Sequence, residues 1–131
     1  MIVVDASAII AILQDEPEKG PFKTVIENDD RALVSTVSAL EAGIVMRARH
    51  GEEGLKGLFD FLAAADIEVA AFDEDQAKAA VEAYGRYGKG LNPTTRLNLG
   101  DCAAYALAKT LDAPLLFKGG DFSATDIQSA F

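Results

Sequence analysis

The stretch Ile2-Val3-Val4-Asp5, followed by a helix-favouring run from Ala6 to Gln14, decides the fold class of this chain. Three consecutive β-branched residues without a polar interruption are typical of a parallel strand that is buried on both faces. Similar short apolar runs recur, with helix-like segments between them, at Ala32–Val34, Ile67–Phe72 and Leu115–Phe117. Alternating strands and helices predict an α/β fold, a three-layer sandwich with a short central parallel sheet.

Size, charge and residue counts exclude several classes of protein. The 131 residues fit a single domain spanning 1–131, and a composition that is 50% hydrophobic argues against disorder. A net charge of −9 has the wrong sign for a non-specific nucleic-acid coat protein, although an enzyme can still hold a polyanion through a metal ion. The single Cys102 excludes a cysteine zinc cluster and an internal disulfide, and the single His50 argues against a Ser-His-Asp triad.

No run of residues approaches the roughly 20 apolar residues of a membrane-spanning helix. The start of the chain also lacks the basic region and the small-residue cleavage site of an export signal. We therefore expect a soluble, cytoplasmic protein.

Helix boundaries follow from proline, glycine and apolar spacing. Pro17 is expected in the first turn of a second helix, and Gly51 is expected to close a third helix. The third helix has its apolar stripe at Val37, Leu40, Ile44 and Ala48, and a fourth spans Leu55–Leu62. Gly85–Pro93 is expected to form a cationic loop, and Asn98–Leu111 a nearly all-apolar helix.

Four acids stand near strand ends or on core-facing helix surfaces. Asp5 ends the first strand, and Asp121 follows the last clear strand after a Gly-Gly turn. Glu41 and Asp101 lie on helices among apolar neighbours, and none of the four has a basic partner beside it in sequence. Because buried carboxylates are costly unless they are paired or metal-bound, the pattern favours a shared site for Mg²⁺ or Mn²⁺.

Each acid also has a purely structural interpretation. Asp5 suits the N-cap of the first helix, and Asp121 can simply stabilise a turn. The segments Ser38–Glu41 and Asn98–Asp101 both fit the spacing of a capping box.

Two other polar groups have candidate roles. Ser7 can donate a hydrogen bond to a neighbouring carboxylate or to a phosphate, and a structural role in the first helical turn is equally compatible with the sequence. Three cations flank the glycine-rich loop and can contact RNA phosphates, or can be merely solvated: Arg86, Lys89 and Arg96.

Four ordered motifs resemble the PIN-domain family over essentially the whole chain. They are I-V-V-D-A-S-A, the S-x-x-E of the third helix, L-N-L-G-D-C-A-A-Y-A-L-A, and P-L-L-F-K-G-G-D-F-S-A-T-D-I. The nearest similarity is to VapC-type toxins of VapBC toxin–antitoxin modules. The chain departs from that pattern at Gly120, where relatives often have Asn or Asp. Its closing strand is also short, Ile127–Phe131.

The resemblance implies a Mg²⁺-dependent endoribonuclease, with Mn²⁺ as a possible substitute. It implies catalytic roles for Asp5, Glu41, Asp101 and Asp121, and supporting roles for Ser7 and Asn98. Asp5 and Asp101 would be the principal metal ligands, Glu41 would orient or deprotonate the attacking water, and Asp121 would hold a second ion or a metal-bound water. Whether one or two ions act stays open.

The resemblance also implies partners: an RNA substrate, a cognate antitoxin and a second copy of the chain in a homodimer. The helices Ala8–Leu13 and Leu55–Leu62 are the surfaces expected for dimerisation. An antitoxin arginine would suit the acidic cleft, because its guanidinium pairs bidentately with carboxylates.

Three other functions compete with the ribonuclease. A phosphatase with an Asp-x-Asp motif lacks its second acid, since position 7 is serine. A phosphoacceptor receiver-like signalling domain has a suitable Lys118 but lacks an acidic pair after the first strand. A non-catalytic PIN-fold binding module would have no need of all four acids.

Overall fold

A computed structural model describes residues 1–91 and 93–131. The predicted α/β class is confirmed, with a sheet of four parallel strands in the order β3-β2-β1-β4. The elements in chain order are β1 (Ile2–Val4), α1 (Ala6–Leu13), α2 (Lys19–Glu27), β2 (Ala32–Ser35), α3 (Thr36–Ala64), β3 (Ile67–Ala70), α4 (Glu74–Tyr87), α5 (Leu99–Thr110) and β4 (Leu115–Leu116). None of these helices is both long enough and apolar enough to cross a bilayer.

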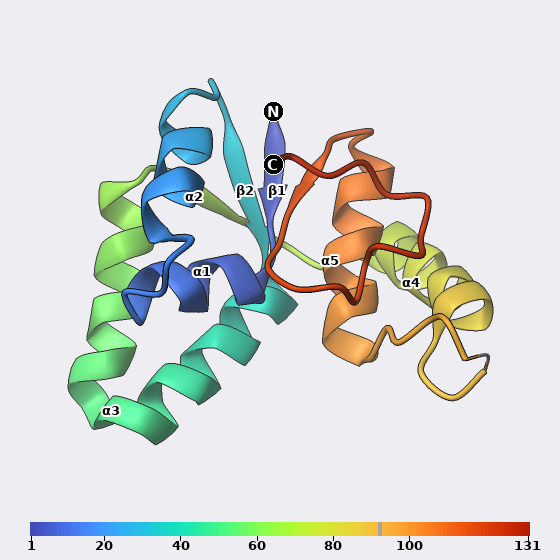
Figure 1. Cartoon of the computed structure of the whole chain (residues 1–131), viewed down its shortest axis with the longest axis horizontal. Coiled ribbons are helices and arrows are strands. Elements are labelled where there is room, and N and C mark those ends of the chain that lie inside the picture. The colour runs from blue at the N-terminus through green and yellow to red at the C-terminus, as the bar shows by residue number, and fades with distance from the viewer. Residues whose placement is uncertain (92) are drawn as a thin grey trace.

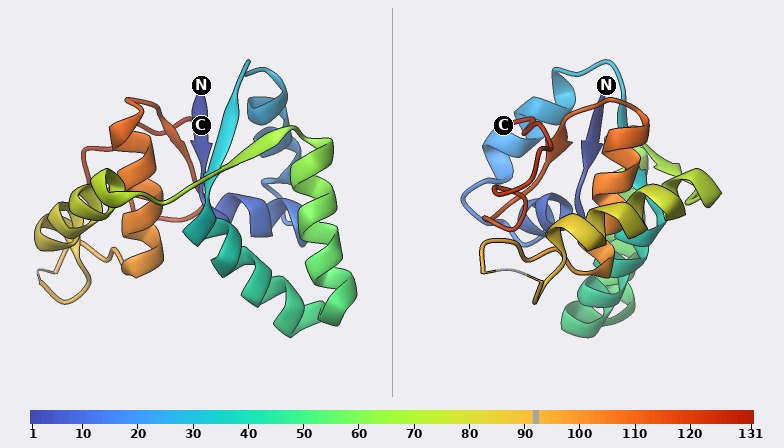
Figure 2. Two further views of the ribbon diagram at one scale, coloured as in Figure 1. Left: turned by 180° about the vertical axis from the view of Figure 1, so that it is seen from behind. Right: turned by 90° about the vertical axis from the view of Figure 1, so that its right-hand side faces the viewer.

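The sheet separates two layers of helices, as Figures 1 and 2 show. α1, α2 and α3 cover one face, and α4 and α5 cover the other. The strands supply both cores by alternation, because successive side chains point to opposite faces. Ile2 and Val4 face α1, whereas Val3 between them packs with α5. Burial on both faces explains why the strands are continuous apolar runs.

The strand order locates the place where a ligand can bind. The chain builds the sheet outward from β1 through β2 to β3 and then returns to place β4 on the other side of β1. Ligands of such sheets bind beyond the carboxyl ends of the strands, where the order reverses. Here that point is the end of β1, which Asp5 follows directly.

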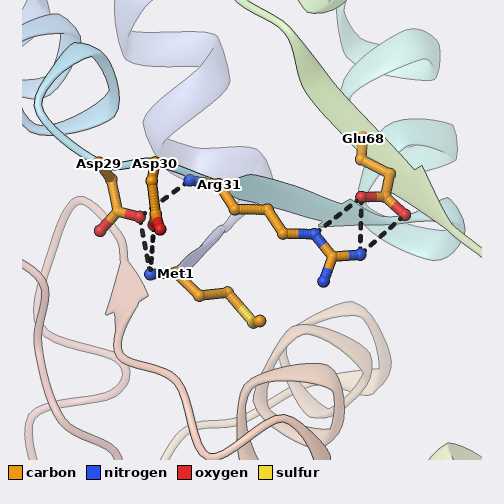
Figure 3. Close-up of polar contacts among 5 residues, drawn as sticks. All are labelled: Met1, Asp29, Asp30, Arg31 and Glu68. Atoms are coloured by element: carbon orange, nitrogen blue, oxygen red, sulfur yellow. Dashed lines mark hydrogen bonds and ion pairs between the residues drawn. The ribbon is translucent and has the colours of Figure 1, made fainter.

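Polar contacts join the amino ends of the strands, at the far end of the sheet from Asp5 (Figure 3). The guanidinium of Arg31, just before β2, binds Glu68 of β3 through Nε and Nη2 at 2.9–3.2 Å. The N-terminal ammonium of Met1 lies 2.7 Å from Asp29 and 3.4 Å from Asp30. These ion pairs lie at the amino ends of the strands, away from Asp5 at the carboxyl end of β1.

Several predicted boundaries change. α2 begins at Lys19, so Pro17 precedes the helix instead of occupying its first turn. The predicted end of the third helix at Gly51 is confirmed: its φ of 66° and ψ of −154° are non-helical and divide α3 into two helical arms. The loop after α4 begins at Gly88, three residues later than predicted, and Asn92 within it lies outside the described residues.

The expected closing strand Ile127–Phe131 is wrong as a strand. A single parallel bridge joins Ser129 to Leu115, with hydrogen bonds from Leu115 N to Gln128 O and from Ala130 N to Leu115 O, both 2.9 Å. The hydroxyl of Tyr105 and the ammonium of Lys109 also bind Asp126, so side chains help to anchor this segment.

The apolar stripe predicted for the third helix faces largely outward. Leu40 and Ile44 are 63% and 61% exposed, while the buried side of this helix carries small residues such as Ala39, Ala42 and Gly43. The surfaces predicted for dimerisation are also corrected. Most apolar side chains of Ala8–Leu13 and Leu55–Leu62 lie in the protein's own core, because α1 and the second half of α3 pack against each other.

Candidate active site

Four segments bring the predicted acids to the carboxyl end of β1. Asp5 follows β1, Glu41 lies in the second turn of α3, Asp101 lies in the first turn of α5, and Asp121 follows β4. In Figure 1 the end of β1, the start of α3 and the red segment after β4 come together near the lower middle of the view, and α5 begins below and to the right of them. The charges of these acids act on one another: Asp101 raises the pKa of Glu41, Glu41 raises that of Asp5, and Asp5 and Asp121 raise that of Asp101.

Asp5 is both a helix cap and a buried acid. Its Oδ2 accepts hydrogen bonds from the Ser7 N–H at 3.0 Å and the Ser7 hydroxyl at 2.6 Å, so the N-cap interpretation is confirmed. Its other oxygen, Oδ1, is buried and, within the part of the chain that is described, has no hydrogen-bond partner. Burial is the main cause that raises the pKa of Asp5 to about 6, and the Ser7 hydrogen bonds oppose it.

Ser7 holds Asp5 in one orientation. The backbone N–H of Lys118, just beyond β4, donates to the Ser7 Oγ at 3.0 Å. Because Oγ accepts this bond, its own proton is free to point at Asp5 Oδ2. The N–H and the hydroxyl of Ser7 thus fix Oδ2, and among the described residues Oδ1 has no hydrogen-bond partner.

Lys118 forms ion pairs that the sequence did not indicate. Its ammonium binds Glu16 at 2.6 Å and Glu18 at 3.3 Å, which ties the segment before Asp121 to the turn between α1 and α2. These partners come from 102 and 100 residues away, so no local pattern indicates the pairing. The only sequence signal is a lysine placed directly after a core strand.

Asp101 also combines two roles. The predicted capping box is confirmed: Asn98 Oδ1 accepts from the Asp101 N–H at 2.8 Å, and Asp101 Oδ2 accepts from the Asn98 N–H at 3.1 Å. Asp101 is nevertheless only 8% exposed. Burial, with smaller contributions from Asp5 and Asp121, raises its pKa to about 6, although the Asn98 N–H lowers it. Capping therefore does not account for the whole environment of this acid.

Glu41 is half-buried over the first turn of α5. Burial, and then the charge of Asp101, raise the pKa of its carboxyl above the ordinary value. The predicted capping box of Ser38 and Glu41 is wrong, because Ser35 is the N-cap of α3 and accepts from the Val37 N–H at 3.2 Å. Glu41 therefore does not cap α3.

The remaining predicted residues are exposed at the surface. Asp121 and Asn98 are exposed, and so are the three cations predicted to contact RNA, Arg86, Lys89 and Arg96. The guanidinium of Arg86 stacks 5.3 Å from the Tyr87 ring centre at the end of α4. Hydrogen bonds join Tyr87 and Lys89 to Leu97, so the base of the loop is closed.

The donor set fits a hard divalent cation bound through few protein ligands. Among residues 1–91 and 93–131, no three side chains of His, Cys, Asp or Glu form a ready-made metal-binding group, and none of the four acids forms an ion pair. Mg²⁺ commonly retains several waters and uses one or two carboxylates. A buried oxygen of Asp5 without a partner, facing an acidic neighbourhood, meets that requirement.

Comparisons with known proteins identify the family and the fold. A family model described as PIN domain matches residues 2–128. The chain is 47% identical to Ribonuclease VapC30 of Mycobacterium tuberculosis over 126 residues, which cover 96% of this chain and 95% of the relative. It is 46% identical to Ribonuclease VapC of Mycolicibacterium smegmatis, with coverage of 96% and 97%.

Solved structures share the fold at low identity. VapC20 of Mycobacterium tuberculosis, a toxin that cleaves the sarcin–ricin loop, superposes with a TM-score of 0.78 at 17% identity, covering 97% of this chain and 96% of that one. A toxin–antitoxin complex from Klebsiella pneumoniae gives a TM-score of 0.73 at 15% identity, with coverage of 100% and 98%.

Proposed function

Because the chain belongs to the PIN-domain family, among the VapC ribonucleases, we propose that it is a metal-dependent endoribonuclease and the toxin of a toxin–antitoxin pair. One observation carries the proposal: two buried carboxylates, Asp5 and Asp101, lie at the switch point of the sheet without a cationic partner in the described chain. A protein maintains such an unfavourable arrangement where function requires it.

Asp5 and Asp101 would hold Mg²⁺, directly or through water. The ion, when bound, polarises a phosphoryl oxygen, lowers the pKa of bound water and offsets charge on the leaving oxygen. Asp5 offers Oδ1, which has no hydrogen-bond partner among the described residues, and Asp101 offers Oδ1, since its Oδ2 caps α5. Ser7 and Asn98 support these two acids by holding the Oδ2 of Asp5 and the backbone of Asp101.

Glu41 would orient the attacking water and accept its proton. A general base works best when its pKa lies near the working pH, and burial beside Asp101 raises the pKa of Glu41 in that direction. Asp121, which is exposed after β4, would hold a further water or a second ion. The products expected are a 5′-phosphate and a 3′-hydroxyl.

RNA would be held by the exposed cations Arg86, Lys89 and Arg96. Local cations, and a metal ion that offsets the acids, let a chain of net charge −9 bind a polyanion. The antitoxin is proposed to cover the acidic cleft, where an arginine can pair with carboxylates bidentately.

Homodimerisation would use apolar side chains that the fold leaves exposed. Val81 on α4 is 73% exposed and Leu99 on α5 is 78% exposed, and both line a cavity of about 700 Å³ between these helices. Val81→Asp should then convert a dimer to a monomer in light scattering. An unchanged mass would exclude this surface.

The decisive experiment is RNA cleavage with and without divalent metal. Purified protein should cleave RNA in Mg²⁺ or Mn²⁺ and stop when EDTA is added, and the new ends should carry a 5′-phosphate. Metal-independent cleavage that leaves a 2′,3′-cyclic phosphate would reject the mechanism. Asp5→Asn is the matched inactive variant, since its amide oxygen still accepts the Ser7 hydrogen bonds.

A further inference from the structure

The carboxylate of Glu41 lies against the backbone of Gly100. A Cβ atom placed on Gly100 would come within 2.9 Å of Glu41 Oε1 and within 3.1 Å of both Cδ and Oε2. All three close contacts belong to one carboxylate, so this group from α3 rests on the Cα of Gly100 in the first turn of α5. Gly100 directly precedes Asp101 in the capping turn.

The backbone does not explain a glycine at this position. Positive φ angles occur at other glycines, such as Gly51 and Gly119, and not at Gly100. Within a helical turn glycine is disfavoured against alanine, so its presence needs another reason. At Gly54 and Gly88 a Cβ would collide with backbone oxygens at 2.4 Å, whereas at Gly100 it meets only the end of a flexible side chain.

We propose that Gly100 is a positioning residue, which leaves room for the Glu41 carboxylate to sit on the first turn of α5 beside Asp101. The positive end of the α5 dipole attracts a carboxylate, and this attraction opposes repulsion from Asp101. A side chain at position 100 pushes Glu41 out of that place while the fold accommodates the change. The catalytic consequence rests on the proposed ribonuclease function, but the contact itself does not.

Gly100→Ala should separate stability from activity. Alanine favours the helix, and the displaced group is mobile, so the variant should melt no lower than the wild type. Its kcat for RNA cleavage should fall about ten- to a hundredfold with KM unchanged, because a small misplacement of a reacting group is enough to slow chemistry. Gly57→Ala is the control, since nothing lies within 4 Å of a Cβ there, and its activity should equal that of the wild type.

A second measurement reads the contact without activity. In a Glu41→Ala background, Gly100→Ala should raise the Tm of the metal-free protein more than it does when Glu41 is present. Gly57→Ala should raise the Tm equally in both backgrounds. If Gly100→Ala fails to fold while the double variant folds, the contact is again supported.

Three outcomes would overturn the inference: wild-type kcat in Gly100→Ala, an equal Tm change in the two backgrounds, or a double variant that also fails to fold. If the wild-type protein cleaves no RNA, the proposed function fails. The Tm comparison still decides whether Glu41 rests on Gly100, so the two failures are distinguishable.

Discussion

Replacing Asp101 by asparagine separates the two roles of this side chain. The structure makes Asp101 both a partner in the capping box of α5 and a buried acid beside Asp5 and Asp121. Asparagine keeps an oxygen that can accept from the Asn98 N–H, has nearly the same volume, and removes the charge. The sign of the stability change therefore tells which role dominates.

The magnitudes favour the buried charge. The pKa of Asp101 rises from 3.8 to about 6, so its ionised form is less stable in the folded than in the unfolded chain. Ionisation costs the fold about 3 kcal/mol, a loss that grows as pH rises from about 4 and is nearly complete at pH 7. Loss of a negative charge from the first helical turn costs up to about 1 kcal/mol. Asp101→Asn should therefore stabilise the metal-free protein by about 2 kcal/mol at pH 8.

Urea unfolding in EDTA measures this difference. At pH 4 the gain should largely vanish, because wild-type Asp101 is then protonated in the folded protein. Asp75→Asn is the matched control: Asp75 is an exposed acid in the first turn of α4, so its loss should slightly destabilise the fold at pH 8. Added Mg²⁺ should stabilise the wild type more than Asp101→Asn. A variant that is less stable than the wild type at pH 8 would refute the electrostatic reasoning.

Two further substitutions test the surroundings of the acids. Ser7→Ala leaves the Lys118 N–H without its acceptor and should cost about 1–3 kcal/mol in unfolding free energy. It should also raise the pKa of Asp5 above its value of about 6, because a hydrogen bond to the charged form is lost. Carboxyl ¹³C NMR of the metal-free protein measures this pKa, and an unchanged value would contradict the prediction. Replacing three exposed cations together should weaken RNA binding and flatten its dependence on salt: Arg86, Lys89 and Arg96. An unaltered salt slope would show that these side chains are merely solvated.

The structure places the predicted acids at one edge, but their pairing with metal and RNA remains a prediction. The sequence indicated Asp5 and Asp121 because each follows an apolar strand, and parallel strands end at the same edge of a sheet. It indicated Asp101 through its apolar neighbours on α5. The apolar stripe assigned around Glu41 was misleading, since Ile44 is 61% exposed. That helix buries small residues, which hydrophobicity alone underrates.

The sequence by itself determined the order of strands and helices and the two-faced core. This follows because burial, β-branching and residue spacing act over a few neighbouring positions. Only the tertiary structure decided which groups contact across the site: Lys118 with Ser7 and Glu16, and Glu41 with Gly100. These contacts join segments about 60 to 110 residues apart, and their distances depend on how the helices pack on the sheet. Local patterns place each residue on its element, and packing sets the distances between elements.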